Sequence, residues 1–326
     1  MKIRNIFTAA ALAVVIAAGS ARAAEPAAPA TLFEYPSVPD KLTKPAMRAN
    51  FMVEHLWDKC NLEKTAVTDL VAFHNTFTDY LSFFALADKA VVEKSIKKYV
   101  ERVAKNPTNL NLTVGMLHSD VLNLRSQYCS DEVYTMFADN IAAAKKVDKA
   151  LKAKLQAQAA VLANSAVGAT VADFPLRQSP AGAASLYGLT AGTTILFFNS
   201  DGCIDCSIYK VRLSASIAAS SLIKEGHLRI VSVYGGDPTA VESKLATEPA
   251  DWEVACIDTA AYDQRLRPAV YVLDSDKKIT TKFVDIDSLL RGSGPEAFEQ
   301  LRAAAPDGLR FCVDVLKALA PRETVE

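Results

Sequence analysis

The chain has 326 residues, of which 50% are hydrophobic and 22% are charged, and its formal net charge is −1. This composition is typical of a folded, water-soluble protein, and the length predicts two domains. The charge balance gives no support for a nucleic-acid partner, which would require a basic surface.

Residues 1–23 have the pattern of a signal peptide. Lys2 and Arg4 form a basic start, an apolar run covers residues 6–18, and Ala21-Arg22-Ala23 places small residues where signal peptidase cleaves. The run is shorter than the roughly 20 apolar residues that span a bilayer, and no cysteine near the cleavage point could carry a lipid. We therefore expect a mature protein outside the cytoplasm, most simply in a bacterial periplasm, with no transmembrane segment.

Residues 24–40 are rich in Ala and Pro and predict a flexible leader, and residues 41–165 predict a helical domain. Apolar residues recur at helical spacing in one amphipathic segment: Val92, Ile96, Tyr99 and Val103. Asn106 and Pro107 should end this helix, because proline lacks the backbone amide and disfavours helix in the residue before it. A second long helix is expected over residues 133–163.

Residues 166–326 predict an α/β domain, because strand-like runs alternate with helical runs. We expect strands at 194–198, 228–234 and 252–258, a helix over 207–224, a loop at 235–238, and a last helix within 295–320. The runs AVYVL and TTKFV, joined by a turn at Ser275-Asp276, predict an antiparallel hairpin at one edge of the sheet.

Cys203 and Cys206 directly follow the strand predicted at 194–198. The first cysteine should lie at the N-terminus of a helix, where unpaired amides and the helix dipole favour a thiolate over a thiol. The second lies one turn further on, close enough to form a disulfide with the first. This arrangement indicates thiol–disulfide exchange, in which Cys203 attacks a substrate disulfide and Cys206 resolves the mixed disulfide.

Three segments of this domain resemble the thioredoxin fold, and specifically the periplasmic thiol:disulfide interchange proteins of the TlpA and ResA type. They are VADFPL, ILFFNSDGCIDC and YDQRLRPAVYVLDSDKKI, and the resemblance covers about residues 168–320. It implies a mixed sheet flanked by helices, and no cofactor other than the redox-active disulfide. The implied partners are protein thiols and disulfides in the cell envelope and an upstream electron donor. It also implies a cis-proline at Pro268, preceded by Arg267, whose backbone pairs with the substrate chain.

The segments HLWDKCNL and SQYCSDEVY resemble a helical domain of unknown function that precedes thioredoxin-like domains in envelope proteins. This resemblance implies no chemistry for residues 41–165. We expect the helical domain to select or position a partner.

The chain departs from thioredoxin at three positions. Phe197 stands where thioredoxin keeps a buried acid, Gly202 stands where tryptophan is common, and Ile204-Asp205 separate the two cysteines. The carboxylate of Asp205, with Asp201 close in sequence, disfavours a thiolate on Cys203. Destabilising the reduced pair makes it a better reductant, so disulfide reduction or isomerisation is expected.

Three other interpretations of the thiol pair were compared with exchange. A structural zinc site requires four ligands, but no second CxxC is present and the four histidines are scattered, so no metal is expected. A peroxidase would carry Pro and Thr at set distances before the reactive cysteine, and residues 199–202 carry neither. An inert disulfide in a non-catalytic binding or assembly module remains the main alternative.

The other four cysteines form two candidate pairs, Cys60 with Cys129 and Cys256 with Cys312. They are either small buried residues or two structural disulfides, which an oxidising compartment permits. Six thiols allow fifteen complete pairings, so the sequence alone leaves the choice open.

Overall fold

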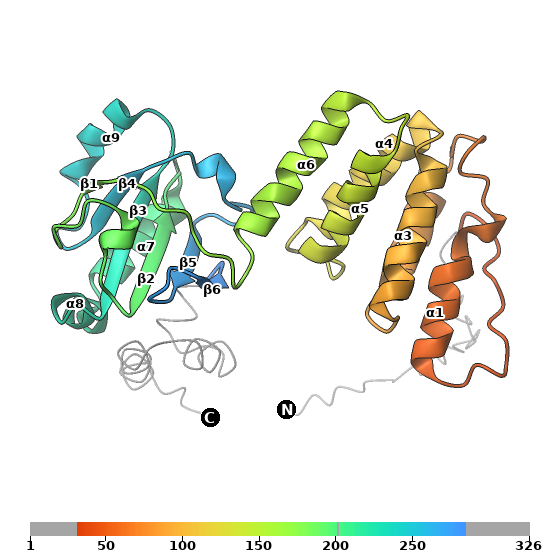
Figure 1. Cartoon of the computed structure of the whole chain (residues 1–326), viewed down its shortest axis with the longest axis horizontal. Helices are drawn as coiled ribbons and strands as arrows, with labels where there is room; N and C mark the ends of the chain where they lie inside the picture. Colours follow the sequence, from red (N-terminus) through yellow and green to blue (C-terminus); the bar gives the residue numbers. More distant parts are fainter. Residues whose placement is uncertain (1–30, 201, 285–326) are drawn as a thin grey trace, which may run out of the picture.

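The computed structural model describes residues 31–200 and 202–284, which form a helical N-terminal part and a sheet-containing C-terminal part (Figure 1). The predicted signal peptide, Asp201, Cys312 and the helix expected within 295–320 lie outside the described residues. The α/β architecture expected for the C-terminal part and the helical N-terminal part are both confirmed.

The helices of the N-terminal part lie roughly side by side (Figure 1). They are α1 (Pro45–His55), the 3-10 helix η1 (Leu56–Lys59), α2 (Leu70–Ser82), α3 (Lys89–Val103), α4 (Pro107–Met116), the π-helical turn η2 (Leu117–Val121), α5 (Asp131–Ala143) and α6 (Lys149–Asn164). Asn106 and Pro107 follow the end of α3 as expected, and they also begin α4. The Asn106 side chain accepts the amides of Thr108 and Asn109, and Pro107 occupies the first turn.

The single helix expected over residues 133–163 is wrong, because α5 and α6 are separate. Ala144 ends α5 in an extended conformation, and the Asp148 carboxylate accepts the amides of Ala150 and Leu151 at the start of α6. A side-chain cap of this kind begins a new helix rather than continuing the old one. The chain therefore turns back, and α6 packs against α5.

The leader predicted over residues 24–40 contacts the helical part in the portion that the structure describes, which begins at residue 31. The amide of Leu32 donates to Thr76 Oγ1 at 3.0 Å, and the Tyr35 hydroxyl donates to Asp79 at 2.7 Å. Phe33 also packs against the helical core. These apolar and aromatic side chains give the segment enough surface to bury against α2.

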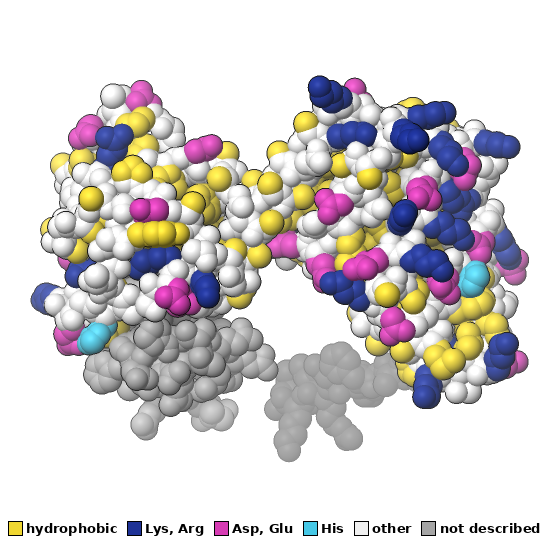
Figure 2. Space-filling view, viewed as in Figure 1, with side chains coloured by type: hydrophobic (Ala, Val, Ile, Leu, Met, Phe, Trp, Pro, Cys, Tyr) yellow, Lys and Arg dark blue, Asp and Glu magenta, His cyan; other side chains and the backbone are white. Residues whose placement is uncertain are grey.

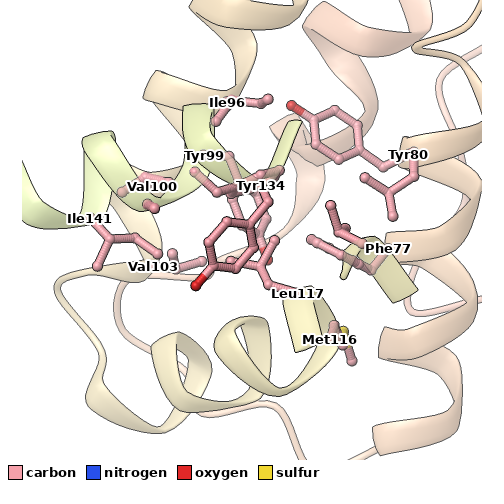
Figure 3. Close-up of a cluster of buried hydrophobic side chains, with 14 of the residues drawn as sticks. Phe77, Tyr80, Ile96, Tyr99, Val100, Val103, Met116, Leu117, Tyr134 and Ile141 are labelled. Atoms are coloured by element: carbon pink, nitrogen blue, oxygen red, sulfur yellow. The ribbon is translucent and has the colours of Figure 1, made fainter. Parts of the chain in front are cut away.

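A core of aromatic and aliphatic side chains holds the helical part together (Figure 3). Tyr80 and Tyr99 are almost completely buried within it. The hydroxyls of these two tyrosines have partners, since Tyr80 bonds to Ser95 at 2.6 Å and Tyr99 to Thr113 at 2.8 Å. Burial of these rings therefore leaves neither hydroxyl unpaired.

The C-terminal part is built on one six-stranded sheet with the order β1-β4-β3-β2-β5-β6. Its elements are β1 (Leu176–Gln178), η3 (Leu186–Gly188), β2 (Thr193–Phe198), α7 (Ile204–Ser214), α8 (Ile217–Lys224), β3 (Leu228–Tyr234), α9 (Pro238–Leu245), β4 (Glu253–Cys256), η4 (Thr259–Ala261), β5 (Ala269–Leu273) and β6 (Ile279–Lys282). Strands β2, β3 and β4 are parallel, whereas β1, β5 and β6 run antiparallel to their neighbours. The predicted β5–β6 hairpin is confirmed.

Two helices differ from the sequence expectation. The helix expected over 207–224 is two helices, because α7 ends before Ser216, whose hydroxyl accepts the Ala219 amide and begins α8. The loop expected at 235–238 leads into α9, where Asp237 is the N-cap and Pro238 lies in the first turn. Helices α8 and α9 each begin at a residue whose side chain caps the helix, and this cap is a stronger helix signal than the weak periodicity of such short segments.

The central strand β2 is buried on both faces. Ile195 and Phe197 contribute to the core on the side of Cys206 and Leu213, whereas Phe198 packs on the opposite face. The alternation of side chains along a strand thus places two apolar layers around β2. Because neither face of β2 meets solvent, packing on both sides holds the strand from whose end the turn with the thiol pair leads.

Glu253, at the start of β4, is fully buried, and neither carboxylate oxygen meets a hydrogen-bond donor among the described residues. Burial raises the pKa of this carboxyl above 4.5, and nearby Ser179 and Arg229 offset only part of that rise. Burial therefore favours the protonated form more than it is favoured in an exposed carboxyl. Below about pH 4.5 this carboxyl is protonated in both the folded and the unfolded state, so its burial does not oppose folding. The free energy of unfolding then falls as the pH rises through the folded-state pKa.

We expect Glu253→Gln to raise the free energy of unfolding by about 1 kcal/mol at pH 8, because no buried carboxylate then has to ionise. At pH 4 the variant and the wild type should differ little. Urea unfolding at both pH values measures this. An equal difference between the two proteins at pH 4 and pH 8 would contradict it.

Candidate functional site

A short turn connects β2 to α7 and carries the thiol pair. Gly202 adopts a φ of 70°, a conformation that residues with a Cβ rarely take. The turn places Cys203 at the N-cap of α7, and its Sγ accepts the amide of Cys206 at 3.1 Å. The glycine and the helix start together fix the direction of the first sulfur.

Cys203 and Cys206 form a disulfide in the structure. Cys203 is half-buried, whereas Cys206 is only 4% exposed and belongs to the apolar core beneath α7. A reaction partner can therefore reach Cys203 more readily than Cys206. The sequence predicts Cys203 as the attacking thiol and Cys206 as the resolving thiol, and these roles stay predictions.

Pro268 lies at the same edge of the sheet as the thiol pair. Phe198, the last residue of β2, pairs with Ala269, the first residue of β5, so Pro268 falls just beyond the end of β2. The Arg267–Pro268 peptide bond is cis, as the resemblance implies, and Arg267 is exposed while Pro268 is buried. The strand register thus brings Cys203 and Pro268 to one edge of the domain, although 65 positions separate them in the sequence.

The polar surroundings of the pair differ from those of thioredoxin. Asp205 lies exposed in the first turn of α7, next to Cys206. Phe197 is fully buried in the same core as Cys206, so this core has an aromatic ring at the position of the thioredoxin acid. The Asn199 amide donates to Ser232 at 2.8 Å at the end of β2.

One charged cluster near α7 was missed by the sequence reasoning. Lys210, one turn after Cys206, donates to Glu248 at 2.5 Å and to the Tyr234 hydroxyl at 3.0 Å. The Tyr234 hydroxyl also donates to Glu248, whose side chain is completely buried. The i, i+4 spacing of Cys206 and Lys210 was a signal that both lie on one face of the helix. Glu248 gave no such signal, because only the fold brings it there.

The other cysteines that the structure describes do not join the site. Cys60, Cys129 and Cys256 carry free thiols. The bond between Cys60 and Cys129, which the sequence left open, is not formed in the structure. Arg265 lies by the Cys129 thiol, whereas Arg102 donates to the backbone carbonyl of Cys60. Burial raises the pKa of both thiols and so disfavours their thiolates.

Within residues 31–200 and 202–284, no group of His, Cys, Asp or Glu could hold a metal ion. In the same part of the chain, no helix has the length and apolar character needed to cross a membrane.

Comparison with known proteins identifies the fold of both parts. The model of a domain of unknown function (DUF5106) matches residues 17–165. A thioredoxin-like protein from Bacteroides caccae superposes with a TM-score of 0.61 at 22% identity, covering 79% of this chain and 96% of that chain. No curated protein matches.

Two further solved structures match a smaller share of this chain. The thioredoxin domain of a thiol-disulfide oxidoreductase from Bacteroides vulgatus gives a TM-score of 0.33 at 14% identity, covering 43% of this chain and 99% of that domain. The C-terminal domain of an uncharacterized protein from Bacteroides fragilis gives a TM-score of 0.33 at 22% identity, covering 38% of this chain and 94% of that chain. The superposition on the Bacteroides caccae protein shows that the C-terminal part of this chain has a thioredoxin-like fold. This part follows a helical region that matches a family of unknown function.

Proposed function

We propose that this protein exchanges disulfides with other proteins through Cys203 and Cys206. The observation that carries the proposal is the position of the Cys203 sulfur at the N-cap of α7, bonded to a buried Cys206 and accepting its amide at 3.1 Å. Backbone amides at a helix start favour a thiolate, which is the form that attacks a disulfide.

In the reducing direction, the reaction has two displacements. The Cys203 thiolate attacks one sulfur of the substrate disulfide, which forms a mixed disulfide and releases the other substrate sulfur as a thiolate. Cys206 then loses its proton and attacks Cys203 Sγ, which releases the second substrate thiolate and forms the Cys203–Cys206 disulfide. The pair gives up two electrons, and a dithiol protein acting as electron donor must reduce it again.

Pro268 and Arg267 would present backbone to the substrate chain at the edge beside Cys203. Apolar side chains of α7 are also exposed next to the pair: Ile204 is 75% exposed, Ile208 46% and Val211 66%. Their spacing of four and three residues places them on one face of the helix. An exposed apolar face of this kind suits an extended or partly unfolded polypeptide as substrate.

The compartment and the direction of exchange are part of the proposal. The basic start, apolar run and Ala21-Arg22-Ala23 favour export to the periplasm, where substrates with disulfides persist. Asp205 places a carboxylate within the first turn of α7 and so destabilises a neighbouring thiolate. We therefore propose reduction or isomerisation of envelope proteins rather than their oxidation.

Loss of the attacking sulfur should abolish turnover. We expect Cys203→Ser to reduce the rate of insulin reduction by dithiothreitol to the uncatalysed rate. Cys256→Ser, which removes a free thiol from the same domain, should keep the wild-type rate. Equal rates for wild type and Cys203→Ser would instead favour a non-catalytic binding or assembly module.

Removing the carboxylate from the start of α7 should make the pair more oxidising. We expect Asp205→Asn to raise the reduction potential by about 10 mV, because an exposed charge contact contributes about 0.5 kcal/mol and 30 mV corresponds to 1.4 kcal/mol. Equilibration with glutathione measures the potential. Glu242→Gln on α9 is the control, and a more negative potential for Asp205→Asn would refute the proposed direction.

A further inference from the structure

The loop between η4 and β5 forms hydrogen bonds both to the helical part and to the thioredoxin-like part. The Asp263 amide donates to Ser165 Oγ at 2.8 Å, at the end of α6, and its carbonyl accepts the Tyr271 hydroxyl at 2.6 Å. The Asp263 carboxylate accepts Arg265 and Lys282. Burial alone would raise the pKa of Asp263, but these two cations hold it below its ordinary value.

Arg265 carries the contact into the helical part. Its Nη2 donates to Asp131 at 2.6 Å, and its Nη1 donates to the carbonyl of Leu122 at 2.9 Å. The other oxygen of Asp131 accepts Lys282 at 2.8 Å. One carboxylate at the start of α5 thus binds two cations of the thioredoxin-like part.

This contact lies at a narrow junction. Figure 2 shows a waist between the two halves of the molecule in this view. Arg265 and Lys282 keep only 17% and 15% of their side-chain surface exposed and Asp131 keeps 34%, so the contact is partly buried and water screens it less than a surface ion pair. Buried charge contacts of this kind depend strongly on geometry, because removing one partner leaves the other uncompensated.

The junction is close to the proposed substrate edge. Arg265 precedes Arg267 by two residues, and two residues of chain reach about 7 Å at most. A displacement of the Arg265 backbone would therefore act within this short distance of Arg267 and Pro268. We propose that Asp131 is a positioning residue, through which the helical part holds the Arg267–Pro268 turn in place for a polypeptide substrate. This inference rests on the proposed exchange function.

The test compares a protein substrate with a small one. Reduced wild type, Asp131→Asn, Asp131→Glu and Glu132→Gln are each mixed with insulin or with hydroxyethyl disulfide, and formation of the Cys203–Cys206 bond is followed by quenched-flow mass spectrometry. Glu132 is the matched control, because it lies in the same first turn of α5 but pairs with Lys89 inside the helical part. Hydrogen exchange over residues 262–270 gives a readout that needs no turnover.

We expect Asp131→Asn to lower the second-order rate constant with insulin about tenfold. The loss should appear as a higher half-saturating concentration of insulin, because a contact that positions the substrate-binding residues is lost. Its rate with hydroxyethyl disulfide, which makes no backbone pairing, should not change. Exchange over residues 262–270 should become faster in Asp131→Asn alone, and Asp131→Glu should restore part of the insulin rate.

A wild-type insulin rate in Asp131→Asn, or an equal loss with both disulfides, would overturn the positioning role. A wild type that reacts with neither disulfide would refute the proposed exchange function instead. In that event hydrogen exchange decides the positioning role, because unchanged exchange in Asp131→Asn would overturn it.

Discussion

The hydrogen bond between the Cys206 amide and Cys203 Sγ is the interaction on which the proposed chemistry depends. It exists because β2, buried on both faces, ends at a turn whose Gly202 adopts a left-handed conformation. The turn then starts α7 with a sulfur as its cap instead of the usual oxygen. The fold therefore places the Cys203 sulfur at the positive end of a helix and buries its partner Cys206 one turn below.

The same edge of the sheet connects the site to the helical part. Residues 262–268 leave η4, bind α6 and α5 through Asp263 and Arg265, and then enter β5 at the turn proposed to hold substrate. Under the proposed function, this junction would let the helical part act on the substrate-binding edge, a role that the sequence predicted without a mechanism.

The features that could be predicted from the sequence depend on local spacing. Cys203 and Cys206 follow a recognisable strand and lie at the start of a helix, so their predicted roles follow from that helix start. The role predicted for Pro268, just before a strand, came from the family resemblance. The helix starts at Asp148 and Asp237 were also readable, since an aspartate before a helical run is a cap signal. By contrast, the Asp131–Arg265 contact joins residues 134 positions apart, and Lys210 and Glu248 are 38 apart. Only tertiary packing brings such charges together, so no periodicity could reveal them.

The ionisation of Cys203 in the reduced protein tests the central claim most directly. The rate of alkylation by iodoacetamide, followed at Cys203 by mass spectrometry across pH, reports the thiolate fraction. The account predicts that Cys203 reaches its half-maximal rate at a lower pH than a cysteine in an unfolded peptide of the same local sequence. Coincident profiles for the protein and the peptide would contradict the claim that the start of α7 activates this sulfur.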